Sequence, residues 1–185
     1  MNGVARGLAL AGLQGVLVAS LGGTFLWERA TRPRAWAKTA PVDPRLPVRG
    51  RYLALGLELP LTGLPPERQA PSGSAGAPRP LPYVRVRLVP EGSVLKAVYQ
   101  DEALGPWGTG TGLEGGRVEW IHGQPFVRIQ EPVLFFIPES GPDPSIRTPG
   151  QELWVEVTLP RRGPPRPIRL GIRREGILTP WKPQS

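Results

Sequence analysis

The stretch that decides the fold is YVRVRLVPEGSVLKAVY, which covers residues 83–99. Its first half alternates apolar side chains with arginines: Val84, Arg85, Val86, Arg87 and Leu88. In an extended strand successive side chains point to opposite faces, so this alternation is typical of a strand with one buried face. Residues 90–93, Pro-Glu-Gly-Ser, have the composition of a turn, and an apolar-rich run returns over residues 94–99. The stretch therefore predicts a β-hairpin.

Other short runs on both sides of this hairpin also read as strands. They cover residues 52–59, 118–121, 126–129, 133–137, 153–159, 168–173 and 177–181. No stretch after Trp27 shows a helical period. Because about eight short strands are separated by turn residues, we predict a mostly β domain over residues 48–185, an antiparallel sandwich or barrel with long Pro/Gly-rich loops. Residues 65–82 contain almost nothing to bury and predict a disordered insertion.

The segment upstream of the predicted domain is rich in proline. Prolines stand at positions 33, 41, 44 and 47, and each fixes φ and removes a backbone donor. Residues 29–47 therefore predict a tether with little regular structure.

The first 28 residues predict a transmembrane anchor. From Gly7 to Trp27 the chain has 21 residues without a charge, and Trp27 ends the run where an interfacial aromatic belongs. A helix of that length spans about 30 Å, the thickness of the bilayer core. A cleaved signal peptide is the alternative, but its apolar core is normally shorter.

Small residues recur every four positions along the predicted helix. They are Gly3, Gly7, Ala11, Gly15, Ala19 and Gly23. Such spacing lets another helix approach closely. It can also arise by composition alone, because about half of the segment is Gly, Ala or Ser. We expect a multi-span membrane protein, or a second copy of this helix, to pack on this row, with membrane lipid around the remainder.

The flanking charges leave the topology open. Arg6 precedes the helix, whereas Arg29, Arg32, Arg34 and Lys38 follow it. The positive-inside rule therefore favours a cytoplasmic domain, but the rule is weaker where a long folded domain follows.

Composition and motifs give no support to an enzyme. The chain lacks cysteine, which excludes disulfides, zinc–cysteine sites and thiol nucleophiles. Its one histidine, His122, lies beside Gly123 in a predicted hairpin turn, and no motif places a serine or a carboxylate there. Glu139 and Asp143 lie in the loop PESGPDP, where solvated acids are commoner than catalytic pairs. We therefore expect no catalytic residues, no cofactor and no metal site.

The net charge of +8 raises the question of a polyanionic partner. Five arginines alternate with apolar residues on predicted strands: Arg85, Arg87, Arg128, Arg169 and Arg173. If they share a sheet face they could form a basic surface for anionic lipid headgroups. An ordinary solvated face is the alternative. We expect no nucleic acid partner, because exposed aromatic residues for base stacking are sparse.

Three stretches of the chain resemble a known family. Residues 31–37 continue through Gly50, Tyr52 and Leu55 in a pattern similar to the bacterial membrane-anchored proteins named for the motif GDYXXLXY. Arg51 replaces the aspartate of that motif and Leu57 replaces its final tyrosine. Residues 134–139 and 168–173 also look similar to the family. The resemblance implies an N-terminal anchor, a domain on the periplasmic side of the inner membrane, an association with multi-span membrane proteins and no established activity.

These features favour a non-enzymatic accessory subunit, whose helix packs against a multi-span inner-membrane protein while its β domain lies at the periplasmic surface. The alternative is a periplasmic binding module for a small ligand, an anionic lipid headgroup or a cell-wall fragment. From the residues alone, Gly50 and Tyr52 need be no more than the turn and the core tyrosine that start a strand.

Overall fold

The computed structural model describes residues 3–41, 52–65, 83–100, 113–138, 143–144, 146, 148–160 and 163–182. The chain divides into two compact units, Met1–Arg32 and Pro33–Ser185, and each is described by itself.

The first unit contains the helix α1, Gly3–Thr31, and none of its described residues is buried. The helix is long and apolar enough to cross a membrane, a property that a signal sequence would share. Its hydroxyl groups are satisfied within the helix, because Ser20 Oγ donates to the carbonyl of Leu17 and Thr24 Oγ1 donates to that of Ser20, both at 2.8 Å. Such internal bonds are what a helix in lipid requires.

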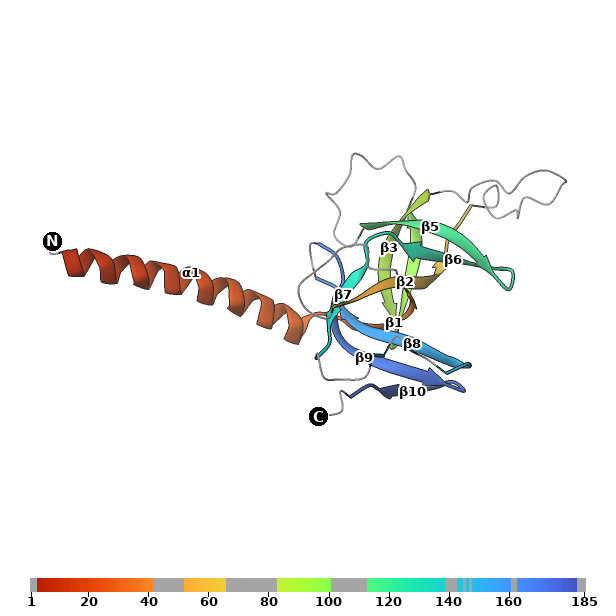
Figure 1. Ribbon diagram of the computed structural model, residues 1–185. Helices are drawn as coiled ribbons and strands as arrows, with labels where there is room; N and C mark the ends of the chain where they lie inside the picture. The colour runs from red at the N-terminus through yellow and green to blue at the C-terminus, as the bar shows by residue number, and fades with distance from the viewer. Residues whose placement is uncertain are drawn as a thin grey trace. The chain divides into compact units, whose positions relative to one another are not determined.

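The second unit is a β domain, as the alternating sequence predicts. Its described residues form the strands β1 Arg34–Pro41, β2 Tyr52–Thr62, β3 Tyr83–Glu91, β4 Val94–Gln100, β5 Leu113–Ile121, β6 Gln124–Ile129, β7 Val133–Phe136, β8 Gln151–Thr158, β9 Arg166–Arg174 and β10 Ile177–Pro180. They make one sheet in the order β10-β9-β8-β1-β4-β3-β5-β6-β2-β7 (Figure 1).

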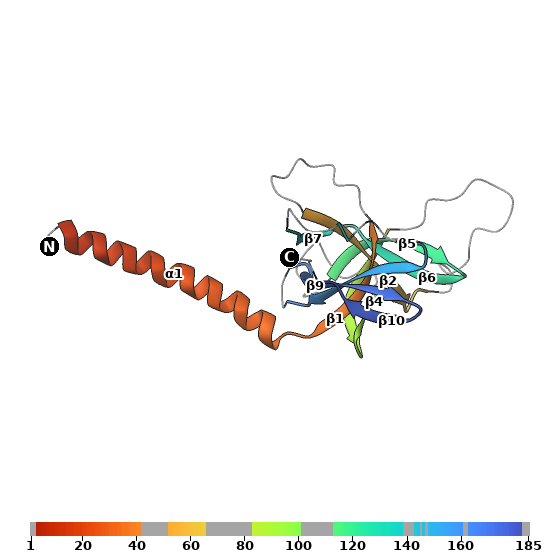
Figure 2. The ribbon, with the colours of Figure 1, turned by 60° about the horizontal axis from the view of Figure 1, so that its bottom comes forward.

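The middle of this sheet closes into a barrel. Strand β2 also pairs antiparallel with β1, from Lys38↔Glu58 to Pro41↔Leu55, so that β1, β4, β3, β5, β6 and β2 form a ring. The strands curl around a common core (Figure 2). Strands β8, β9 and β10 continue the sheet beyond β1, and β7 continues it beyond β2. The predicted antiparallel sandwich or barrel is therefore a barrel with additional strands.

The core of the barrel is aliphatic. It is made by inward-facing side chains that include Leu55, Leu57 and Leu59 of β2 together with Val84 and Val86 of β3. Inward residues of β8 and β9 belong to the same cluster. The added strands therefore bury apolar surface with the ring, which is the main contribution to their stability.

The prediction of an irregular tether is wrong for residues 29–31 and 34–41 of the range 29–47. Residues 29–31 end the helix, and Arg34–Pro41 is a central strand of the sheet. Ala35, Ala37 and Thr39 point inward and are buried, and β8 lies on one edge of β1 while β4 and β2 share the other. Pro33 precedes the strand and Pro41 is its last residue, paired with Leu55, so neither removes a ladder hydrogen bond from the middle of the strand. Residues 42–47 lie outside the described residues.

The turn prediction at His122 and Gly123 is confirmed. Both residues have positive φ, 51° and 76°, and they connect β5 to β6 as a two-residue hairpin turn. Strand β5 begins at Leu113, earlier than the predicted run over residues 118–121. Gly116 is required there, because a Cβ at this position would lie 2.5 Å from Val127 Cγ2 and 2.7 Å from the carbonyl oxygen of Arg128.

Candidate functional site

The main polar feature of the β domain is a row of alternating charges on the outer surface of the sheet. It crosses six neighbouring strands in the order Arg173 of β9, Glu152 of β8, Lys38 of β1, Glu58 of β2, Arg128 of β6 and Glu119 of β5. We call these six residues the charge ladder.

The centre of the charge ladder is Lys38. Its Nζ lies 2.9 Å from Glu152 Oε1 and 3.4 Å from Glu58 Oε1. On the far side of Glu58, Arg128 Nη2 lies 3.7 Å from Glu58 Oε2 and 3.1 Å from Glu119 Oε2. The side chain of Glu58 is only 9% exposed, so its carboxylate depends on these two cations for compensation of its lost hydration.

The electrostatics of Lys38 and Glu152 reflect this arrangement. Burial alone would raise the pKa of Glu152, but hydrogen bonds from Lys38 and Trp154 and the charges of Lys38 and Arg173 lower it below the ordinary value. Burial alone would lower the pKa of Lys38, but Glu152 and Glu58 raise it. Both groups therefore keep their charges over a wider pH range than they would in the unfolded chain.

Two tryptophans lie beneath arginines on the same outer surface. The guanidinium carbon of Arg169 is 5.3 Å from the ring centre of Trp36, and that of Arg173 is 5.0 Å from the ring centre of Trp154. Arg169 also donates from Nε to Glu156 Oε2 at 2.6 Å. Gly171 lies between these contacts, and a Cβ there would stand 2.9 Å from the ring of Trp36. Arg169 is thus held by an aromatic face and a carboxylate together, and Arg173 lies over an aromatic face.

Carboxylates lie among the five arginines of the predicted basic face. The strand register does place all five arginines on the outer side of the sheet. However, Arg128 and Arg169 form ion pairs with carboxylates, and Arg173 lies opposite Glu152. Arg85 and Arg87 are on β3, where Arg85 is half-buried and Arg87 is exposed. Three of the five arginines therefore belong to a charge-balanced surface.

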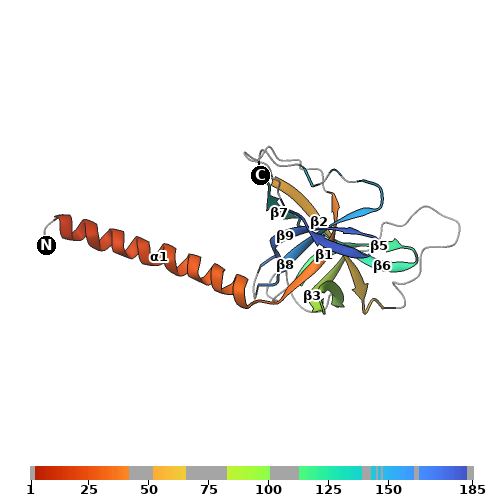
Figure 3. The ribbon, with the colours of Figure 1, turned by 90° about the horizontal axis from the view of Figure 1, so that it is seen from below.

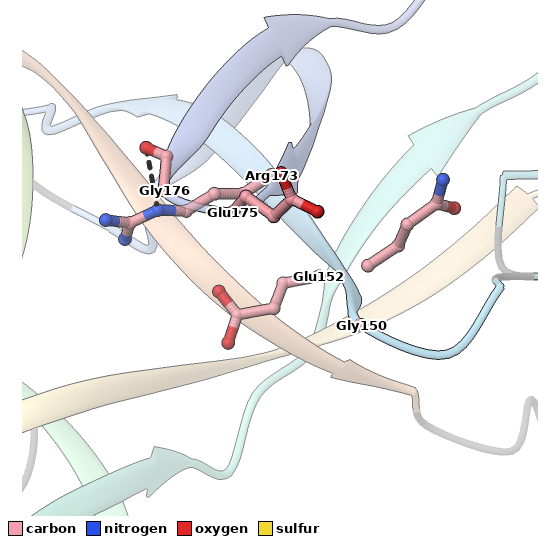
Figure 4. A pocket seen from close by; sticks show the side chains of 6 residues that line it. Gly150, Glu152, Arg173, Glu175 and Gly176 are labelled. Carbon is pink, nitrogen blue, oxygen red and sulfur yellow. Dashed lines mark hydrogen bonds between the residues drawn. The ribbon is translucent and has the colours of Figure 1, made fainter.

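An open hollow lies where β8 begins and β9 turns into β10 (Figure 4). Gly150, Gln151, Glu152, Arg173, Glu175 and Gly176 line its volume of about 590 Å³. The Nε of Arg173 donates to the carbonyl of Gly176 at 3.3 Å. Acidic and basic groups both face this hollow, so its chemistry suits a ligand that carries both signs of charge.

The predicted absence of catalytic and metal sites remains a prediction. Within the part of the chain that the structure describes, no three His, Asp or Glu side chains come together as metal ligands. His122 is exposed in its turn. Glu139 lies outside the described residues, whereas Asp143 is described and half-buried.

The two described residues of the family-like motif differ in burial on strand β2. Gly50 lies outside the described residues, and Leu55 is in the core, only 1% exposed. Tyr52 is 41% exposed and contacts Phe136, which corrects the expectation of a tyrosine packed in the core. Sequence reasoning also missed the acidic members of the charge ladder, because only the strand register brings Glu58, Glu119 and Glu152 beside the basic residues.

Comparisons with known proteins do not assign this chain to a family. No protein-family model, no curated protein and no solved structure matches this chain. The resemblance to the GDYXXLXY proteins therefore stays a prediction.

Proposed function

We propose that this chain is a non-enzymatic, membrane-anchored accessory subunit. In this proposal α1 crosses a bacterial inner membrane and packs against a helix of a multi-span protein. The β domain then acts as an interaction module at the periplasmic surface, the side that the family resemblance implies. The observation that carries the proposal is the row of small residues along α1, a helix long and apolar enough to cross a membrane.

The helix α1 contains six glycines, Gly3, Gly7, Gly12, Gly15, Gly22 and Gly23. Four of them, Gly3, Gly7, Gly15 and Gly23, stand in the row of small residues at four-residue spacing. Each glycine in a helix costs up to about 1 kcal/mol relative to alanine in water. Small residues at four-residue spacing offset this cost where a second helix fills the space.

The geometry of the helix selects the middle of the row. A row with four-residue spacing winds by about 40° per step around a helix of 3.6 residues per turn. A single partner helix therefore contacts only part of the row, centred on Ala11, Gly15 and Ala19. Right-handed crossings of the GxxxG type follow such a row.

The test compares two double variants in the full-length protein. Gly15→Leu with Ala19→Leu fills the row, whereas Ala9→Leu with Ser20→Leu adds leucines on the side of α1 roughly 120–140° away from Gly15, at about 100° per residue. Each protein is purified from native membranes in mild detergent, and co-purifying membrane proteins are quantified. We expect the unaltered and control proteins to retain one multi-span protein in near-equal amount and the row variant to lose it. Recovery of a protein without any partner, or equal recovery with both variants, would contradict the proposal.

A binding module is the second candidate, and the hollow beside Arg173 favours it. Groups of both signs line this hollow, as a small ligand such as a peptide-bearing cell-wall fragment would require. Arg173→Gln in the full-length protein should then abolish binding of soluble cell-wall fragments in titration calorimetry. Arg174→Gln is the matched control, because Arg174 is the next residue and does not line the hollow.

A further inference from the structure

The outer surface of β2 and β7 carries three large apolar side chains that stay exposed. Tyr52 is 41% exposed, Leu134 54% and Phe136 57%. Tyr52 lies opposite Phe136 in the register, and their ring centres are 5.5 Å apart in an edge-to-face arrangement. Leu134 shares their face, because it is two residues from Phe136 along the strand. We call these three residues the apolar edge.

The apolar edge lies at a defined place in the β domain. Strand β7 is the last strand in the sheet order, next to β2. In Figure 1, Figure 2 and Figure 3, β7 lies on the same side of the β domain as the start of β1, although the register places Tyr52 beyond Pro41, the last residue of β1. The residues that join the domain to the rest of the chain therefore enter on the side that carries the apolar edge.

The connection to α1 is short. Only Arg32 and Pro33 separate the last residue of α1 from the first residue of β1. From Trp27, where the uncharged run ends, to Arg34, four helical and three extended steps reach at most about 16 Å. A bilayer crossed by α1 consequently keeps the start of β1 within reach of the lipid headgroups.

We propose that the apolar edge inserts into the boundary between headgroups and acyl chains of the bilayer that α1 crosses. This inference rests on the anchoring part of the proposed function and does not require a protein partner for α1. Tyrosine favours this layer because its ring is apolar while its hydroxyl stays hydrated. Phe136 and Leu134 supply the apolar area that drives shallow insertion. Two side chains on the four-residue strand β7 and one on the neighbouring β2 offer far less than the roughly 800 Å² per partner of a standard protein interface, which favours lipid as the occupant.

The absence of cysteine makes the test direct. Single cysteines replace Phe136, Ile177 or Leu17 in the full-length protein, each is given a nitroxide spin label, and the proteins are reconstituted into vesicles of zwitterionic and anionic phospholipid. Collision with oxygen, which concentrates in lipid, is compared with collision with a water-soluble nickel chelate. Ile177 is a matched control, because it is 72% exposed. It begins β10 at the turn from β9, and this turn lies on the opposite side of the β domain from β7 in Figure 1.

We expect the label at position 136 to show a higher oxygen-to-nickel ratio than the label at position 177, and the difference to persist at high salt. Equal ratios at positions 136 and 177 would overturn the inference. Protection of position 136 from both reagents would overturn it in favour of a second copy of the chain. Loss of the difference at high salt would indicate electrostatic association instead. The label at position 17 reports the location of α1 itself. A low oxygen-to-nickel ratio at this position would overturn the membrane anchoring on which both proposals rest. A high ratio there, with equal ratios at positions 136 and 177, would overturn only the insertion of the apolar edge.

Discussion

At the scale of single residues, Lys38 holds the charge ladder together because it neutralises two carboxylates from different strands. Replacing it with methionine keeps most of the packing volume but leaves Glu58 and Glu152 without their shared cation. Breaking a fully buried ion pair costs about 3–5 kcal/mol, and partial exposure of Lys38 reduces this to about 1–3 kcal/mol. We expect Lys38→Met to lower the free energy of unfolding by that amount, as measured by denaturant unfolding of the full-length protein in detergent.

Lys96 provides the control for this prediction. It forms an ion pair with Glu91, whose side chain is 64% exposed. Lys96→Met should therefore change stability by less than about 0.5 kcal/mol. Equal effects of the two substitutions would show that the ladder contributes no more than an ordinary surface pair.

The pH dependence of stability follows from the same residues. Because the pKa of Glu152 is lowered in the folded state, its contribution is present above the ordinary value of 4.5 and is lost as the pH falls through the folded pKa. Because the pKa of Lys38 is raised, its contribution is present below the ordinary value of 10.5 and is lost as the pH rises through the folded pKa. The difference in Tm between the unaltered protein and Lys38→Met should thus be largest between these limits. A difference that is constant from acid to alkaline pH would exclude the ladder as its cause.

At the scale of elements, the hairpin of β5 and β6 depends on adjacent glycines with different surroundings. A Cβ at Gly116 would meet the backbone of Arg128 and the side chain of Val127, whereas one at Gly115 would meet only the ring of Tyr83, at 3.1 Å. Gly116→Ala should therefore lower stability by about 1–3 kcal/mol through overpacking. Gly115→Ala should cost less, because the tyrosine ring can move. Thermal unfolding of both variants checks this order, and the reverse order would contradict the register of β5 and β6.

Strand β1 lies where the sequence predicted an irregular tether. Hydrogen exchange should protect the amides of Ala35, Ala37 and Thr39 as strongly as those of β8, since all lie in a buried sheet. The turn at Glu175 and Gly176 should exchange early and serves as an internal reference. Early exchange throughout residues 34–41 would contradict a central strand there and support the irregular tether predicted from the sequence.

The sequence predicted the elements whose pattern is local. Residues 83–99 carry a two-residue period and a turn, and they form β3 and β4 as expected. Strand β1 escaped prediction because its inward residues are mostly alanines between prolines, which carry little apolar signal. The run over residues 133–137 is apolar on both faces, so its period could not show that Leu134 and Phe136 face outward. The charge ladder joins residues as distant as 38 and 152, and only the register of the closed barrel brings them together.

At the scale of the whole domain, the six strands of the ring are consecutive, β1 to β6, yet they do not form a complete core. Leu153, Val155 and Val157 of β8 and Leu170 of β9 belong to the buried cluster. A chain that ends at Gly150 should therefore lack a protease-resistant β domain, whereas the full-length protein should yield one that begins near Pro33. A stable fragment ending near residue 130 would show instead that the ring folds without the added strands.

The pairing of β1 with β8 also constrains how the protein is made. Strand β1 is the first part of the β domain to leave the ribosome, but one of its edges remains open until Gln151–Thr158 has followed. Synthesis at about 5–20 residues per second separates these events by several seconds. In the proposed membrane arrangement, an unpaired strand edge stays close to the bilayer during that interval. We therefore expect the sheet to be completed late in the folding of the domain, only after Gln151–Thr158 has been synthesised.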